Sequence, residues 1–145
     1  GRISEIKTPS RKASRATLMD KADRAFSLFI RTRDSQAYDG KAFRCISCGR
    51  ILPIEQADCG HYVNRQHMSL RFSELNCHAQ CRKCNRFMEG NQQDYRKGLI
   101  EKIGEQKVLL LESTKHITNK ISNFELELLA KHYKTETKKF KHQIK

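Results

Sequence analysis

Two Cys-x-x-Cys pairs constrain this chain more than any other feature of its sequence. Cys45 and Cys48 form the first pair, and Cys81 and Cys84 form the second. Each pair offers two thiolate ligands from one tight turn, and two pairs complete the tetrahedral shell of a structural zinc ion. Redox-active pairs are the alternative, but the spacing favours structural Zn²⁺. Such a site would fix both ends of the segment between the pairs.

The cysteine content also bears on the environment in which the protein works. The first residues of the chain contain no apolar signal-peptide core, so nothing there indicates export. Because thiols stay reduced in the cytosol, metal binding is favoured over disulfides, and we expect a cytoplasmic protein. The two remaining cysteines, Cys59 and Cys77, are expected to be small buried residues, with a ligand role as the less favoured alternative.

The charge balance indicates the kind of partner. The formal net charge is +13, and basic residues recur in clusters along the chain. An imbalance of this size favours a polyanion as partner. Nucleic acid fits better than a membrane surface, because no basic amphipathic helix carries an aromatic face and no window approaches the ~18 apolar residues of a membrane span. We therefore expect DNA or RNA as a partner and no membrane.

Composition and periodicity divide the chain into three regions. We expect a basic flexible arm over 1–16, a zinc-stabilised domain with a leading helix over 17–112, and a C-terminal helix with a basic tail over 113–145. An apolar stripe at helical spacing predicts a helix over 17–33, with Thr17 and Asp20 at its capped start. A second stripe at 121–129 includes Phe124 and Leu128 and predicts the last helix, which starts at a Ser122/Glu125 capping box. These stripes would form either the core or a homodimer interface.

The region between the stripes is predicted to contain a hairpin and two helices. Short alternating segments at 57–63 and 68–72 fit two strands, and 75–80 reads as a loop. A helix follows Arg82, starting either at Cys81 or again after Gly90-Asn91, and ending at Gly104. A short helix is expected over 105–112. Residues 131–145 are rich in lysine and are expected to fray.

The order of His61, Asn76 and Asn85 around the second cysteine pair resembles the HNH, or His-Me finger, endonucleases. Within that superfamily the chain is similar to the NinG/Rap family of lambdoid phages. The resemblance rests on CISCGR at 45–50, GHY at 60–62, LRF at 70–72, His78, QC-x-x-CN at 80–85, GN at 90–91, YR-x-GLI-x-x-IG at 95–104 and FSLFIRTRD at 26–34. It implies a small α+β fold in which a zinc-clamped ββα-metal core has flanking N- and C-terminal helices.

The resemblance also implies a catalytic set made of His61, Asn76 and Asn85. An imidazole with a pKa of ~6.5 can take a proton from water, so His61 is the expected general base. Asn85 matches a ligand position for a catalytic Mg²⁺ or Mn²⁺, and Asn76 matches an asparagine whose amide holds the neighbouring loop.

One part of the HNH pattern is missing from this chain. Many members carry an acidic metal ligand directly before the histidine, where this chain has Gly60. Asp58 and His78 are the two candidates to replace it. Because i and i+3 point to opposite faces of a strand, Asp58 would serve beside His61 only if the strand bulges at Cys59-Gly60.

Two functions follow from these observations. The first is a structure-selective DNA endonuclease that cuts branched recombination intermediates such as D-loops and Holliday junctions, in the cytosol of a bacterium that carries the phage or prophage. The second is a non-catalytic, zinc-dependent nucleic-acid-binding module. A junction needs two cuts, which makes a homodimer attractive. The preference for branched DNA comes entirely from the family resemblance.

Overall fold

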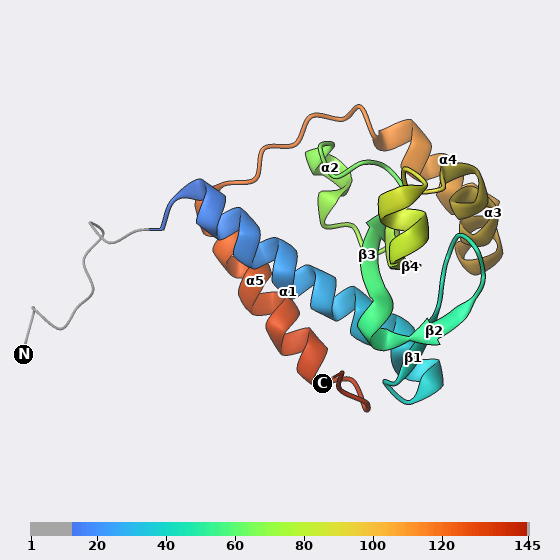
Figure 1. The fold of residues 1–145 in the computed structure, drawn as a ribbon. Helices are drawn as coiled ribbons and strands as arrows, with labels where there is room; N and C mark the ends of the chain where they lie inside the picture. Colours follow the sequence, from blue (N-terminus) through green and yellow to red (C-terminus); the bar gives the residue numbers. More distant parts are fainter. Residues whose placement is uncertain (1–12, 145) are drawn as a thin grey trace, which may run out of the picture.

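The computed structural model describes residues 13–144. Figure 1 shows two long helices lying side by side, with small sheets beside them and two shorter helices on the far side. The α-helices are α1 (Arg15–Ser35), α2 (Met68–Arg71), α3 (Gln92–Ile103), α4 (Glu105–Thr114) and α5 (Asn123–Lys138), and the strands are β1 (Ala42–Arg44), β2 (Ile51–Pro53), β3 (Ala57–His61) and β4 (Cys77–Cys81). Short 3-10 turns span Gln36–Tyr38 and Ile54–Gln56, and a π-helical turn, η5, spans Lys83–Phe87. The fold is α+β, as predicted.

Helix α1 is the leading helix that the sequence predicts, longer by two residues at each end. It begins after Ser14, whose side-chain oxygen accepts a hydrogen bond from the backbone N–H of Thr17 at 3.2 Å. The cap is therefore Ser14, not the Thr17/Asp20 start expected. Phe26 and Phe29 are buried on the apolar face of α1, where their rings contact Tyr133 of α5.

Helix α5 begins at the predicted capping box. The Glu125 backbone N–H donates to the Ser122 hydroxyl at 3.1 Å, and the Ser122 N–H donates to the Glu125 carboxylate at 3.3 Å. The predicted apolar face is half right, since Ile121 is buried and Leu129 packs against the core, whereas Phe124 and Leu128 are exposed. The buried face instead carries residues at helical spacing that contact α1, namely Leu126, Ala130, Tyr133 and Thr137. Because Tyr133 and Thr137 are anchored there, the helix continues to Lys138 and does not fray from 131 onward. The two apolar stripes thus contribute to one core within a single chain.

The predicted hairpin is half right. Strand β3 lies within the first predicted segment and ends at His61, but its antiparallel partner is β4, with Gly60 opposite His78. The segment predicted as the second strand forms helix α2, and the segment predicted as a loop forms β4. Every residue of β4 is buried, so its sequence lacks the alternation of a half-exposed strand. The pairing of β3 with β4 is also unbroken, so no bulge occurs at Cys59-Gly60.

The chain after the second cysteine pair is helical in two pieces. The η5 turn holds Cys84, and the backbone then breaks at Glu89, Gly90 and Asn91, which all have positive φ. Helix α3 restarts at Gln92 and ends at Gly104 as predicted, where the Gly104 N–H donates to the Ile100 carbonyl at 2.9 Å. Helix α4 follows and confirms the predicted short helix.

Helix α3 also fixes the end of β3. Tyr95 is fully buried, and its hydroxyl donates to the Gly60 carbonyl at 2.7 Å. Residues 1–12 of the predicted basic arm lie outside the described residues, and its last two, Arg15 and Ala16, belong to α1. Across residues 13–144, no helix combines the length and the apolar character that a membrane crossing needs.

Candidate metal centre and groove

The four paired cysteines come together at one point of the fold. Cys45 follows β1 and Cys48 lies in the turn before β2, where the Gly49 N–H closes the turn by donating to the Cys45 carbonyl at 2.9 Å. Cys81 is the last residue of β4, and Cys84 lies in η5. The cluster therefore ties the β1–β2 hairpin to the β3–β4 pair.

The spacing of the sulfur atoms suits a tetrahedral ion. All four Sγ atoms lie within 4.8 Å of one another, and those of Cys48 and Cys81 are 3.9 Å apart. A Zn–S bond of about 2.3 Å in a tetrahedron places two sulfurs about 3.8 Å apart. All six cysteines are free thiols. The cluster is thus compatible with zinc and forms no disulfides.

Hydrogen bonds to the sulfur atoms support the same conclusion. Backbone N–H groups of Cys48 and Cys81 donate to the Cys45 sulfur at 3.5 and 3.3 Å. The Arg50 guanidinium donates to the Cys48 and Cys81 sulfurs at 3.4 and 3.6 Å. Burial raises the pKa of Cys48, but the hydrogen bonds from Arg50 outweigh it and lower this pKa to about 7. Donors of this kind stabilise the thiolate of Cys48, whereas burial raises the pKa of Cys45 and Cys84.

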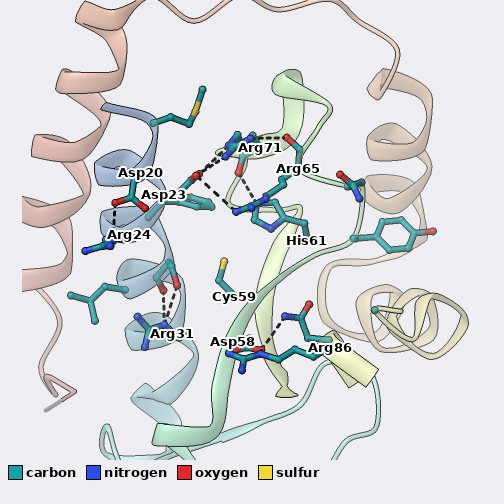
Figure 2. Close-up of a pocket in the computed structure, with 18 of the residues that line it drawn as sticks. Asp20, Asp23, Arg24, Arg31, Asp58, Cys59, His61, Arg65, Arg71 and Arg86 are labelled. Carbon is teal, nitrogen blue, oxygen red and sulfur yellow. Dashed lines mark hydrogen bonds and ion pairs between the residues drawn. The ribbon is translucent and has the colours of Figure 1, made fainter. Parts of the chain in front are cut away.

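A large groove lies beside the cysteine cluster, between α1, β3 and residues 85–92 (Figure 2). Its volume of about 1510 Å³ exceeds the ~300–1,000 Å³ of small-molecule pockets. Its charged lining is rich in arginine and includes four acids: Arg24, Arg31, Arg65, Arg71, Arg86, Asp20, Asp23, Asp58 and Glu89. A groove of this size suits an extended ligand, and its arginines outnumber its acids by one, although most of them are ion-paired with those acids.

His61 lies at the end of β3, in the wall of this groove. Its Nε2 is 2.9 Å from the Arg71 carbonyl oxygen, which can only accept, so Nε2 carries the proton. Burial lowers the pKa of His61 below its ordinary value. The ring is therefore neutral near pH 7 and keeps its Nδ1 lone pair for another group.

The segment that holds His61 is itself fixed by an ion pair. The Arg71 guanidinium donates to both oxygens of Asp23, with Nε to Oδ1 at 2.9 Å and Nη2 to Oδ2 at 2.5 Å. Bidentate pairs of this kind fix geometry better than single contacts do. Because Asp23 belongs to α1, the leading helix positions the carbonyl that orients His61. Sequence reasoning missed Asp23, since nothing local to it marks a partner so far along the chain.

Asp58 and Asn85 meet on the other side of β3. The Asn85 Nδ2 donates to Asp58 Oδ2 at 3.0 Å, and Arg86 binds both Asp58 oxygens at 2.9 Å. Without a bulge, Asp58 and His61 point to opposite faces of β3, and the three-residue step separates their Cα atoms by about 10 Å. Both line the groove, but the structure does not bring them into contact.

The glycine before His61 has a steric cause. A Cβ atom at Gly60 would lie 2.2 Å from Oε1 of Gln80 and 2.9 Å from its Cβ. Gln80 is buried on β4, two residues beyond the partner of Gly60, and its side chain donates to Ser47 and Gly90 at 2.9 and 2.6 Å. A carboxylate directly before His61 would therefore displace the contacts that join β4 to the first cysteine loop.

Asn76 occupies the structural position expected of it. It is fully buried and pairs with both backbone groups of Val63, accepting from the N–H at 2.8 Å and donating to the carbonyl at 2.9 Å. It also donates to the Leu70 carbonyl at 3.2 Å. The amide thus connects the residues just after β3 to those just before β4.

His78 is placed away from the groove. It is buried, with Nδ1 3.1 Å from the Arg33 guanidinium and Nε2 2.8 Å from the Leu75 carbonyl. Burial is the main cause that lowers the pKa of His78, to about 3. Because both ring nitrogens have partners, His78 offers no free ligand atom and does not join His61, Asp58 or Asn85.

The basic residues near the second cysteine pair divide into two groups. Arg65, Arg71 and Arg86 line the groove. Arg82 instead donates to the Glu55 carbonyl at 2.6 Å, and Lys83 is exposed outside the groove lining. Helix α1 adds Arg24 and Arg31, which the sequence did not single out for this role.

The fold and site define a small α+β protein with a cysteine cluster that fits zinc and an arginine-lined groove. The family model described as "Bacteriophage Lambda NinG protein" matches residues 4–143, and the chain belongs to the NinG family. It is 40% identical to Protein ninG of Escherichia phage lambda over 100 residues, which are 68% of this chain and 46% of that protein. It is 42% identical to Protein ninG of Salmonella phage P22 over 91 residues, which are 62% of this chain and 41% of that protein.

The chain therefore spans about half the length of the curated relatives that it matches. No solved structure matches it.

Proposed function

We propose that the chain is a metal-dependent endodeoxyribonuclease with an HNH-type site that cuts branched recombination intermediates. The observation that carries this proposal is the setting of His61. It is a neutral imidazole at the end of a strand in a β–β–helix unit, oriented by a backbone carbonyl and facing an arginine-lined groove. A histidine that serves only in the core would not need a free nitrogen in such a groove.

His61 acts through Nδ1 as the general base. The Arg71 carbonyl holds the Nε2 proton at 2.9 Å, so Nδ1 takes the proton from a water that attacks the scissile phosphorus in line. The Asp23–Arg71 ion pair keeps this carbonyl in place from α1. The lowered pKa keeps the base unprotonated at neutral pH.

Asp58 and Asn85 hold the catalytic Mg²⁺ or Mn²⁺. Because β3 has no bulge, this cation does not lie beside His61, and the scissile phosphate reaches from one to the other across the groove that both residues line. Their hydrogen bond uses the Asn85 Nδ2, which leaves the Asn85 Oδ1 free to bind a hard cation beside the carboxylate. A bound cation offsets the charge that develops on the phosphoryl oxygens and the leaving oxygen. Arg86 binds the same carboxylate, so it must release Asp58 when the cation enters and is then free to bind a phosphate.

The groove binds DNA through its arginines. Arg24, Arg31 and Arg65 contact successive phosphates, so affinity falls steeply with salt. Phe87, which is 80% exposed directly after Arg86, is available to stack on an unpaired base. Unpaired bases occur at junctions and D-loops, so such stacking, worth ~1–3 kcal/mol per base, favours branched over linear DNA.

Recombination substrates, the bacterial host cytosol and a homodimer that makes two cuts complete the proposal. They follow from the resemblance to phage recombination endonucleases rather than from a contact in the fold. The α1 stripe considered for the dimer interface is used in the core, whereas Phe124 and Leu128 of the second stripe are exposed and remain available for a dimer contact.

The test is cleavage of a synthetic four-way junction with Mg²⁺ or Mn²⁺. His61→Ala should lower the rate about 10²–10⁴-fold, as expected for loss of a general base. His116→Ala, which removes an exposed histidine after α4, is the matched control and should cut normally. If the folded His61→Ala protein cuts as fast as wild type, His61 is not the base.

One observation favours a second function, a non-catalytic zinc-dependent nucleic-acid-binding module. Asp58 is already neutralised by Arg86 through both of its oxygens, and a purely binding groove needs no free carboxylate. A crystal soaked in Mn²⁺ separates the two functions. An anomalous peak beside Asp58 and Asn85 supports the nuclease, and an empty position together with tight junction binding supports the binding module.

A further inference from the structure

Three potential metal ligands outside the four-cysteine cluster gather on one face of the β3–β4 pair. Cys59 and His61 are two residues apart on β3, and Cys77 lies opposite His61 on β4. The two sulfurs and a ring nitrogen of His61 lie within 4.8 Å of one another. Figure 2 shows Cys59 and His61 on β3, in the groove that α1 also lines.

We propose that Cys59, His61 and Cys77 form a second metal site, for a thiophilic cation such as Zn²⁺. Two thiolates and one imidazole are a known donor set for zinc sites that keep an open fourth position. Here Cys77 is fully buried, whereas Cys59 and His61 line the groove. The open position therefore faces the groove and takes water or a substrate oxygen.

The surroundings of His61 are those of a built metal ligand. A ligating histidine almost always donates its second ring N–H to a carbonyl or carboxylate, which fixes the ring and its tautomer. The Arg71 carbonyl accepts this hydrogen bond at 2.9 Å, and Asp23 holds Arg71 in turn. Nδ1 is the nitrogen left to bind the cation. Metal binding displaces the protons of the two thiols into solvent.

Occupation of this site has a consequence for the proposed nuclease. The Nδ1 lone pair of His61 cannot bind Zn²⁺ and accept a proton from water together. Zinc at the second site therefore inhibits cleavage, while Mg²⁺, which prefers oxygen ligands, leaves the site empty. This inhibition rests on the proposed function, but metal binding at the second site does not.

Cobalt titration of the reduced full chain tests the binding. The four-cysteine cluster is first loaded with one equivalent of Zn²⁺, and Co²⁺ is then added. We expect one further equivalent to bind with a thiolate-to-cobalt charge-transfer band, which cobalt at the oxygen ligands of Asp58 and Asn85 would not produce. Cys59→Ala and Cys77→Ala should each lose this second equivalent and keep the first, and His116→Ala should keep both.

Some outcomes overturn the second site. The first is a wild-type chain that binds one equivalent of metal in total, and the second is a Cys59→Ala chain that still binds two. The third is a metal-free wild-type chain in which only four of the six cysteines titrate as thiols. The last result would mean that Cys59 and Cys77 form a disulfide instead. Cys59 is partly exposed, so Cys59→Ala is the variant least prone to misfold, and retention of the first zinc shows that it is folded.

Junction cleavage under added Zn²⁺ tests the consequence. Loss of an outer-shell partner already lowers metal affinity about 10–100-fold, so loss of the ligand Cys59 should raise the zinc concentration for half-inhibition by at least that factor. Each variant is compared with its own zinc-free rate. If the protein never cuts, the nuclease proposal fails, and the cobalt titration still decides the metal site. Equal zinc sensitivity of Cys59→Ala and wild type contradicts inhibition through this site.

Discussion

Asn76→Ala tests whether the buried amide of Asn76 is essential to the fold. The substitution removes three hydrogen bonds and leaves the N–H and carbonyl of Val63 without their side-chain partner. An orphaned buried polar group costs about 1–3 kcal/mol, so two such groups predict a loss of about 2–6 kcal/mol. The Leu70 carbonyl also accepts from the Ser73 N–H and adds little. The predicted loss is a large part of a typical 5–15 kcal/mol stability.

Urea unfolding of the zinc-loaded protein, followed by circular dichroism, measures this loss. Asn64→Ala is the matched control, because Asn64 makes the same kind of side-chain bond to a backbone N–H, that of Gln66, at an exposed position. It should cost only about 0.5–1.5 kcal/mol. If Asn76→Ala loses no more than Asn64→Ala, Asn76 does not hold the loop, and the argument from its hydrogen bonds is refuted.

Three further predictions concern the stability of the fold. Chelation of the metal should unfold the chain, because structural zinc contributes about 10–16 kcal/mol. The helical circular dichroism signal should be lost on chelation and should return with Zn²⁺ but not with Mg²⁺. A helical signal that survives chelation would contradict a structural role for the metal. Ser122→Ala should cost about 1 kcal/mol of stability through loss of the capping box, measured as a lower Tm. Ser113→Ala is the control: the Ser113 hydroxyl bonds to the Leu110 carbonyl in its own helix, so its loss should change Tm little. Burial raises the pKa of Asp34, but Arg33 and Lys102 outweigh burial and lower it from 3.8 to about 2. The resulting stabilisation, on the order of 2 kcal/mol, is complete above about pH 5 and is lost as pH falls through about 2. The difference in unfolding free energy between wild type and Asp34→Asn should therefore shrink with acidification, and a constant difference would contradict the ion pair.

The parts of the fold that the sequence predicts are those with local causes. The apolar stripe of α1 and the Ser122/Glu125 capping box lie within a few turns of chain, and both appear where expected. The cysteine pairs are equally local, since each Cys-x-x-Cys is one turn. Their convergence follows from ligand chemistry rather than from periodicity.

Strand β4 could not be predicted in this way, because its partners are distant. His78 and Gln80 read as loop residues, yet both are buried, with hydrogen bonds to Arg33 and Ser47. A strand covered on both faces shows no alternation, and polar residues fit it only when distant groups satisfy them. The alternating segment 68–72 looked more like a strand and forms helix α2 instead.

The same reasoning explains the candidate site. His61 and Asn85 were singled out by their order around the cysteines, whereas the roles of Asp23 and Arg71 depend on contacts between α1 and the segment before β4. The missing acid before His61 was visible in the sequence. Its cause was not, because the Gln80 side chain that fills this space comes from the opposite strand.

The pairing of α1 with α5 has a consequence for biosynthesis. Phe26 and Phe29 are translated well before Tyr133 and Phe140, the residues whose rings contact them. The apolar face of α1 therefore stays uncovered on the nascent chain until α5 has been synthesised. Pairing of the two helices waits for α5 to leave the ribosome, and until then the emerging α1 is a ready substrate for chaperones.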